Sequence, residues 1–300
     1  MQSFQLGAVE VVRVVEWQGE IAPARDIVPS PPELWRDHES LLVPDHWHPE
    51  RDRYHAAVQT WVLRSEGKVI LVDTGVGNGR DRPQIPLFDH LDTGFAERLA
   101  AAGVRAEEVN LVVNTHIHYD HVGWNTRWDG GWVPTFPNAT YLIPKLDQVY
   151  FDPRNEHRRP VPRTASDQVR RKGSHLVYED SIAPVLDRAT LWENSHRIDR
   201  NLTLEPAPGH TPGSSILRLK SNGDRAVFVG DILHSPVQIL APEHNSCFCE
   251  NPAQAIATRN QTLEHAADER ELVIPAHFAG TGATEITRNG TGFAVQPWTP

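Results

Sequence analysis

The sequence has few sulfur-containing residues, with two cysteines and one methionine among 300 residues. Cys247 and Cys249 are separated by a single residue, which is too close for a relaxed disulfide. Two cysteines are also too few for a disulfide framework, so the composition indicates a reducing compartment. A Cys-x-Cys pair without neighbouring ligands is weak evidence for a metal site, and we assign these two thiols no role.

Long hydrophobic runs and an excess of basic residues are also absent. No apolar stretch approaches the roughly 20 residues that a membrane-spanning helix needs. The first 17 residues alternate valine with polar residues and do not have the pattern of a signal peptide. We therefore expect a cytoplasmic, unprocessed chain without membrane association. The 29 lysines and arginines are outnumbered by 39 acidic residues, and a net charge of −10 argues against nucleic acid as a partner.

The remaining composition is that of a globular chain, 39% hydrophobic and 23% charged. Apolar and alternating runs predict strands, and segments with capping signals predict helices. We expect strands at 8–17, 57–64, 69–72, 111–114, 140–143, 190–192, 202–205, 215–219, 226–229 and 272–274, and helices at 95–102, 174–186 and 252–267. The order is coarsely repeated, with a second half that begins near residue 190. An α/β fold with two sheets packed face to face and helices outside fits this order.

Two segments interrupt this pattern within what we expect to be a single domain, residues 1–300. Residues 20–55 form a proline-rich arm that also contains Trp35 and Trp47. The arm is expected to be irregular, and covering a site, gripping a second subunit or packing on its own core are all open to it. Residues 144–174 form a polar insertion that is either a lid or a solvated flap.

Histidine is unusually frequent, with 16 residues, and several cluster directly after the strand expected at 111–114. Four side chains fall within six residues there, namely His116, His118, Asp120 and His121. Imidazole and carboxylate groups suit zinc and similar divalent ions. On a tight loop at the end of a strand, two of these side chains can converge on one ion while the others face a second, about 3.5–4 Å away.

Further candidate ligands follow other expected strands. They are His210 in Pro-Gly-His-Thr-Pro-Gly, Asp231 in Val-Gly-Asp, and His277 in Pro-Ala-His. Any one of these histidines alone is more often a hydrogen-bonded core or surface residue than a ligand. Their combination with the histidine-rich loop favours a metal centre.

The motif His-x-His-x-Asp-His, followed by the three later candidates and preceded by Asp73-Thr74-Gly75, resembles the metallo-β-lactamase superfamily over residues 57–280. The resemblance implies a four-layer αβ/βα sandwich of two mixed β-sheets flanked by helices. It further implies one metal ion on His116, His118 and His210, and another on Asp120, His121 and His277. Asp231 would bridge the two ions, and Asp73 would orient a ligand histidine from behind. Zinc is the expected metal.

Such a centre implies hydrolysis, because two cations that share a water lower its pKa and generate hydroxide near neutral pH. We expect Asp120 to orient this hydroxide or carry its proton to the leaving group. His234 lies three residues beyond Asp231 and is expected in the cleft, where it would donate to the oxyanion or protonate the leaving group. We also expect this imidazole to titrate near neutral pH.

The substrate is expected to be a small apolar ester. N-acyl-homoserine lactonases resemble this chain in length and ligand set but commonly have tyrosine where His234 stands. Residues 230–238 and the proline-rich arm look closer to the methyl parathion hydrolase-like branch, which implies lactones, aryl esters or phosphotriesters as substrates. Trp124 follows the histidine-rich loop and, with His234, is expected to line the substrate pocket. The resemblance also implies a homodimer formed through the arm.

Two other activities stay open. A glyoxalase II-like thioesterase would use the same ligands, although the chain lacks an evident basic C-terminal substrate platform. A persulfide dioxygenase-like oxidoreductase would hold a single iron ion and would need no second complete set of ligands.

Overall fold

The computed structural model describes residues 2–299, which form two compact units. Unit 1 is built mainly from Glu10–Glu16 and Val58–Glu193. Unit 2 contains Ser3–Val9, Trp17–Ala57 and the chain from Asn194 onward, close to the position where the sequence pattern restarts. Two long strands, β2 and β4, contribute residues to both units. None of the described helices is long and apolar enough to cross a membrane.

The first sheet has the strand order β1-β2-β4-β5-β6-β9-β10, with β3 paired to β4. Strands β4 and β5 form an antiparallel hairpin, whereas β5, β6, β9 and β10 run parallel. The strand bounds are β1 Gln2–Leu6, β2 Val9–Pro23, β3 Trp47–His48, β4 Arg53–Ser65, β5 Lys68–Val72, β6 Val109–Val113, β9 Thr140–Pro144 and β10 Ala189–Trp192. The parallel strands β5, β6 and β9 are short apolar runs that are largely buried, as expected for strands covered on both faces.

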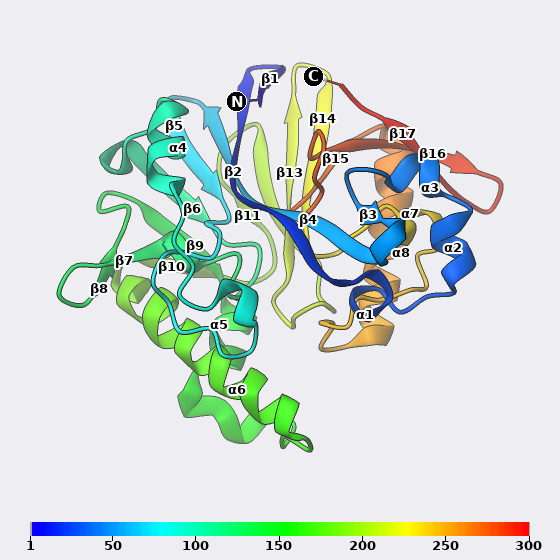
Figure 1. The fold of residues 1–300 in the computed structure, drawn as a ribbon. Coiled ribbons are helices and arrows are strands. Elements are labelled where there is room, and N and C mark those ends of the chain that lie inside the picture. The colour runs from blue at the N-terminus through cyan, green and yellow to red at the C-terminus, as the bar shows by residue number, and fades with distance from the viewer. Residues whose placement is uncertain (1, 300) are drawn as a thin grey trace. The chain divides into compact units, whose positions relative to one another are not determined.

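Three helices of unit 1 lie beside these parallel strands (Figure 1). They are α4 (Phe95–Ala101), α5 (Lys145–Phe151) and α6 (Ala165–Val177). A small antiparallel ribbon, β7 (Thr126–Trp128) with β8 (Trp132–Pro134), follows the histidine-rich loop. Side chains from the strands and helices form one core, which includes Val112, Tyr141, Ile143, Phe95 and Phe151.

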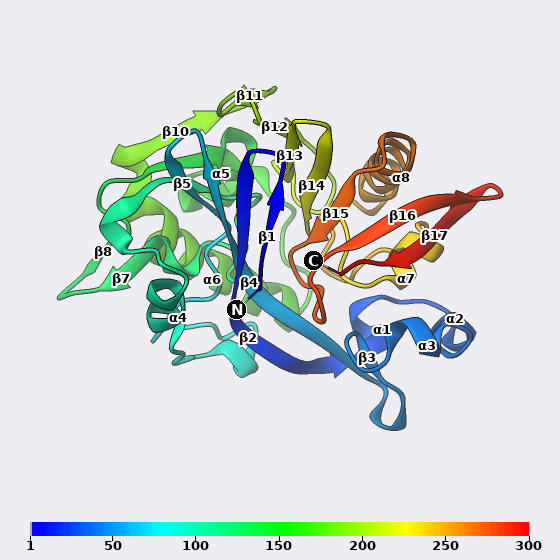
Figure 2. The same cartoon turned by 90° about the horizontal axis from the view of Figure 1, so that it is seen from above.

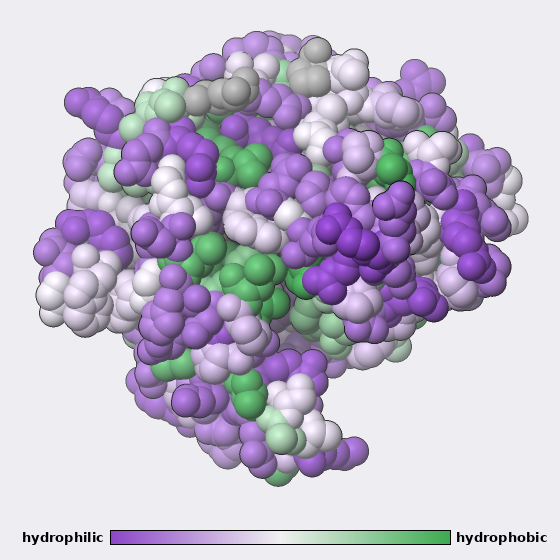
Figure 3. Space-filling model, in the orientation of Figure 1, coloured by the Kyte–Doolittle hydropathy of each residue, from purple (hydrophilic) through white to green (hydrophobic). Residues whose placement is uncertain are grey.

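The segment predicted as a polar insertion is largely helical, because it contains α5 and α6. The helix expected at 174–186 begins earlier, at Ala165, because the Thr164 side chain and Asp167 form a capping box. After Val177 the chain continues as a wider helical turn to Ile182 and a tighter one to Arg188. The surface over α6 is mainly hydrophilic (Figure 3), in agreement with the polar composition of the segment, and its role as a lid or a solvated flap stays a prediction.

The second sheet belongs to unit 2 and has the strand order β11-β12-β13-β14-β15-β16-β17. It is mixed, because β14 and β15 pair in parallel and the other neighbours are antiparallel. The bounds are β11 His196–Arg197, β12 Leu202–Pro206, β13 Ser215–Ser221, β14 Asp224–Gly230, β15 Leu272–Pro275, β16 Thr284–Asn289 and β17 Gly292–Pro297. Helix α8 (Pro252–Glu269) packs along this sheet beside β14 and β16 (Figure 2).

The proline-rich arm is more ordered than its sequence indicates. It contains the short helices α1 (Ala24–Ile27), α2 (Pro32–Arg36) and α3 (Glu39–Leu42). Trp35 and Trp47 are buried in a separate hydrophobic cluster that also includes Tyr54 and Val237, the first residue of α7 (Val237–Leu240). The arm therefore packs in a hydrophobic cluster of its own, and the other two roles, covering a site and gripping a second subunit, stay predictions.

Candidate metal centre

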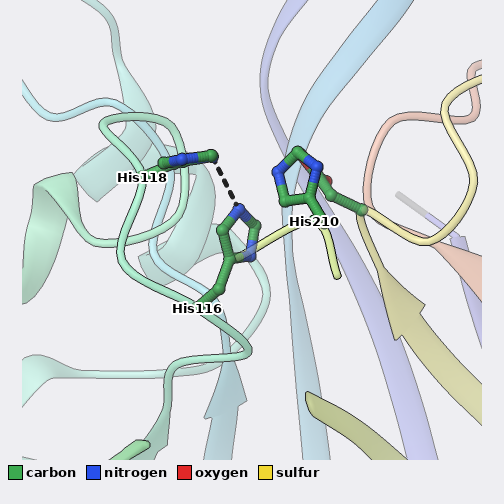
Figure 4. Close-up of side chains that lie close together, drawn as sticks. His116, His118 and His210 are labelled. Carbon is green, nitrogen blue, oxygen red and sulfur yellow. Dashed lines mark hydrogen bonds and ion pairs between the residues drawn. The ribbon is translucent and has the colours of Figure 1, made fainter. Parts of the chain in front are cut away.

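The four motif side chains of unit 1 lie on the loop that follows β6. The Nε2 atom of His116 lies 3.1 Å from Nδ1 of His118, and Figure 4 shows the two imidazoles with this contact drawn. The ring of His121 lies 4.0 Å from that of His116, and its Nε2 atom is 3.7 Å from a carboxylate oxygen of Asp120. The loop therefore brings together all four donors that the sequence predicts.

Asp73 fixes this loop from the end of the neighbouring strand β5. One carboxylate oxygen accepts the backbone N–H of Thr115 at 2.8 Å, and the other accepts the Thr115 hydroxyl at 2.8 Å. The second oxygen also lies 2.8 Å from Nδ1 of His121, which leaves Nε2 of that ring as the atom that can bind a metal. Asp73 is buried and has a φ of 56°, a left-handed conformation that aspartate tolerates at a tight turn.

Two further carboxylates support the loop, and sequence reasoning did not identify them. Asp147, fully buried in α5, accepts the backbone N–H of Ile117 at 2.9 Å. Glu16, buried in β2, accepts the backbone N–H of Val76 and the indole N–H of Trp124, each at 2.6 Å. Burial raises the pKa of Glu16, although these donors oppose the shift. Neither residue leaves a distinctive signal in the sequence, because α5 and β2 each contain other polar or charged side chains.

Trp124 has a packing role in the structure. Its ring stacks on Phe95 with centroids 5.2 Å apart, and only 8% of the residue is exposed. Its remaining surface lines a cavity of about 490 Å³ together with Trp128 and Thr126. Contact between Trp124 and a substrate stays a prediction.

In unit 2 the carboxylate of Asp231 stands at the end of β14 among three imidazoles. One of its oxygens lies 3.1 Å from Nε2 of His277, and the other lies 3.2 Å from Nε2 of His210 and 3.3 Å from Nε2 of His234. All four residues are at most 6% exposed. A buried carboxylate that faces three nitrogen donors has the composition of a ligand set for a divalent cation.

The histidines of this cluster differ in their protonation. Nδ1 of His277 lies 2.9 Å from the carbonyl oxygen of Ala57, so this nitrogen donates and Nε2 faces Asp231. Burial lowers the pKa of His210, but the Asp231 carboxylate and the Cys249 side chain outweigh it and raise the pKa to about 9. Around Cys249, burial raises the pKa of the thiol, whereas hydrogen bonds from His210 and Ser246 reverse this effect and leave it below its ordinary value.

His234 is held rigidly next to the cluster. Its backbone N–H donates to the Gln238 side chain at 2.7 Å, its carbonyl accepts the Tyr54 hydroxyl at 2.6 Å, and its ring stacks on Phe248. Burial lowers its pKa to about 4, and Asp231 only partly offsets this effect. The expectation that His234 titrates near neutral pH is therefore wrong, because for this imidazole burial outweighs the Asp231 carboxylate and keeps the ring neutral at pH 7.

Comparison with known proteins places this arrangement in a family. The sequence profile of the Metallo-beta-lactamase superfamily matches residues 54–277. Acyl-coenzyme A thioesterase MBLAC2 from Bos taurus is 26% identical over 269 residues, which cover 86% of this chain and 87% of the relative. The Homo sapiens protein of the same name is 25% identical over 269 residues, with the same coverage.

Two solved structures show the same fold at lower identity. The hydrolase AbOPH of the beta lactamase superfamily superposes with a TM-score of 0.80 and 21% identity, covering 99% of this chain and 97% of that chain. AidC, a dizinc quorum-quenching lactonase, superposes with a TM-score of 0.76 and 18% identity, with the same coverage. The expected α/β fold with two mixed sheets is thereby confirmed. The chain belongs to the metallo-beta-lactamase superfamily.

Proposed function

We propose that this metal-dependent hydrolase is dinuclear, cytoplasmic and specific for apolar lactones or aryl esters, with phosphotriesters as secondary substrates. The candidate ligands would hold a pair of divalent ions, most simply zinc. One ion would be held by His116, His118 and His210, and the other by Asp120, His121 and His277, with Asp231 between them. The bound ions would lower the pKa of a shared water and polarise the oxygen under attack.

The observation that carries this proposal is the convergence of three buried imidazole Nε2 atoms on one Asp231 carboxylate, at 3.1–3.3 Å. A cluster of this kind is costly to bury without a cation, because the carboxylate and the imidazoles lose water. Nδ1 of His121 contacts Asp73 and Nδ1 of His277 contacts Ala57, and the opposite Nε2 atoms face the carboxylates of Asp120 and Asp231, so Nε2 is the atom that each ring would offer to a metal.

The surrounding side chains suit different tasks in hydrolysis. Asp120 is partly exposed, and its carboxylate would orient the attacking water and carry the proton to the leaving group. His234 is neutral at pH 7, so we assign it the donation of an N–H hydrogen bond to the developing oxyanion. The lowered pKa of this imidazole argues against the second role expected from the sequence, protonation of the leaving group.

The substrate class is tested by a panel of lactones, aryl esters, phosphotriesters, glutathione thioesters and β-lactams, assayed with metal-quantified protein. We expect the largest kcat/KM for neutral, apolar lactones or aryl esters. Absence of turnover for every ester and lactone would overturn the substrate assignment and leave the family unaffected.

A second candidate is thioester hydrolysis, which is favoured by the two relatives that bear the name acyl-coenzyme A thioesterase. Adding an acyl-coenzyme A series to the same panel separates the two candidates. A kcat/KM for acyl-coenzyme A at least tenfold above that for the oxygen ester with the same acyl chain would select thioester hydrolysis.

A further inference from the structure

Cys249 lies beside His210, one of the candidate ligands of unit 2. Its Sγ atom is 3.9 Å from Nδ1 of His210 and 3.6 Å from the hydroxyl oxygen of Ser246. The opposite ring nitrogen of His210, Nε2, is the atom that faces Asp231 at 3.2 Å. The imidazole thus stands between a sulfur atom on one side and the candidate metal position on the other.

The backbone fixes this contact. The N–H of Glu250 donates to the carbonyl of His210, and the N–H of Asn251 donates to the carbonyl of Gly209, each at 2.9 Å. Gly209 has a φ of 135°, and a Cβ atom there would lie 2.3 Å from the backbone nitrogen of Ala255 in the first turn of α8. Only glycine allows this approach. The close approach and the two backbone hydrogen bonds fix the position of the His210 loop relative to the residues that follow Cys249.

A buried arginine of α8 contacts both the stretch of chain that leads to Cys249, residues 242–249, and the loop that carries Asp231. Arg259 is 1% exposed and donates to the carbonyl of Pro242 at 2.6 Å and to the Asn245 side chain at 3.1 Å. Its Nε also donates, at 2.9 Å, to the carbonyl of Ile232, the residue after Asp231. Arg259 therefore hydrogen-bonds to residues of the stretch 242–249 and of the Asp231 loop at the same time.

We propose that Cys249 is a positioning residue for the metal centre, whose sulfur accepts the Nδ1–H of His210 and so directs Nε2 toward Asp231 and the metal. The inference rests on the proposed function, since it takes His210 as a ligand. Ligand histidines commonly donate their second N–H to an oxygen acceptor, as His121 and His277 do here to Asp73 and Ala57. In His210 a thiol sulfur fills this role, so the affinity of the centre depends on Cys249.

The test is the metal dissociation constant, measured by chelator competition on the full chain loaded with zinc. Removing such an acceptor commonly weakens metal binding by about 10–100-fold, and we expect a loss of this size for Cys249→Ala. Cys249→Ser keeps an acceptor and is expected to recover most of the affinity. Cys247→Ala is the matched control, because Cys247 is an exposed thiol in the same stretch of chain whereas Cys249 lies against His210, and this variant is expected to bind metal as the parent does.

His210→Ala separates the two proposals. Weaker zinc binding in His210→Ala together with unchanged binding in Cys249→Ala would overturn the positioning role and leave the proposed function standing. Unchanged binding in His210→Ala would instead overturn the ligand assignment. If Cys249→Ala does not fold, the ¹⁵N spectra of zinc-loaded parent and Cys249→Ser decide the matter. A shifted His210 Nδ1–H signal supports the role, and an unshifted signal overturns it.

Discussion

Asp73→Asn is the substitution that most directly tests how the protein prepares its ligand loop. The carboxylate receives three contacts at 2.8 Å, from the Thr115 N–H, the Thr115 hydroxyl and Nδ1 of His121. Asparagine has nearly the same volume and can keep the oxygen that accepts from the Thr115 backbone. Its amide group would then face Nδ1 of His121 and favour the tautomer that carries the proton on Nε2, the atom needed by the metal.

The magnitude follows from two estimates. A hydrogen bond to a charged group contributes about 1.5–3 kcal/mol, and loss of a partner behind a metal ligand commonly weakens metal binding about 10–100-fold. We therefore expect zinc affinity to fall by about one to two orders of magnitude, with kcat falling in parallel at limiting metal. Chelator competition and metal-titrated kinetics measure both quantities.

Asp152→Asn is the matched control. Asp152 is also buried in unit 1 and contacts Arg154 and the Tyr178 hydroxyl, but none of the candidate ligands is among its hydrogen-bond partners. We expect this variant to unfold more easily and to bind zinc normally. Zinc binding by Asp73→Asn that equals that of the parent would refute the reasoning about the His121 tautomer.

Four other predictions concern the reaction and helix α6. His234→Ala should lower kcat/KM by roughly 10²–10⁴-fold. The loss should be similar for esters with good and poor leaving groups, because the neutral imidazole donates to the oxyanion, and a loss confined to poor leaving groups would contradict this role. Asp120→Asn should reduce turnover much more than stability, and unchanged turnover with metal retained would exclude it as the proton carrier. Thr164→Ala should destabilise α6 by about 1 kcal/mol, seen as faster amide exchange over residues 165–177. Hydrogen bonds from Thr164 and Arg170 lower the pKa of Asp167 to about 2. The ionised Asp167 carboxylate should therefore stabilise α6 fully above pH 3.8, and this stabilisation should disappear as the pH falls toward 2. Stability of α6 that does not change over this pH range would contradict the prediction.

The histidine-rich loop could be predicted from the sequence because its donors are contiguous and follow a short apolar strand. The strands β5, β6, β9 and β12–β15 were predicted for the same reason, since each is an apolar or alternating run between turn signals. The short strands β7, β8 and β11 have two or three residues each and leave no such pattern. The ribbon β16–β17 was also missed, because polar residues interrupt its alternation.

Long-range support of the site could not be predicted. Glu16 lies 108 residues from Trp124, and Cys249 lies 39 residues from His210, so neither contact leaves a local pattern in the chain. The neutral state of His234 depends on burial that only the folded chain creates. The order of the arm could not be predicted for a related reason. Prolines stand at the starts of the short helices α1 and α2, and Trp35 and Trp47 are buried in a cluster with Val237, which is far along the chain.

We propose above that the candidate ligands hold two divalent ions on which hydrolysis depends. Metal content of the purified protein by mass spectrometry, measured alongside turnover during stepwise removal and restoration of zinc, tests it most directly. We predict two ions per chain, loss of turnover on exhaustive chelation, and recovery that follows zinc occupancy. Full turnover by a stringently metal-free sample, or a saturating content of one ion per chain with full activity, would contradict the account.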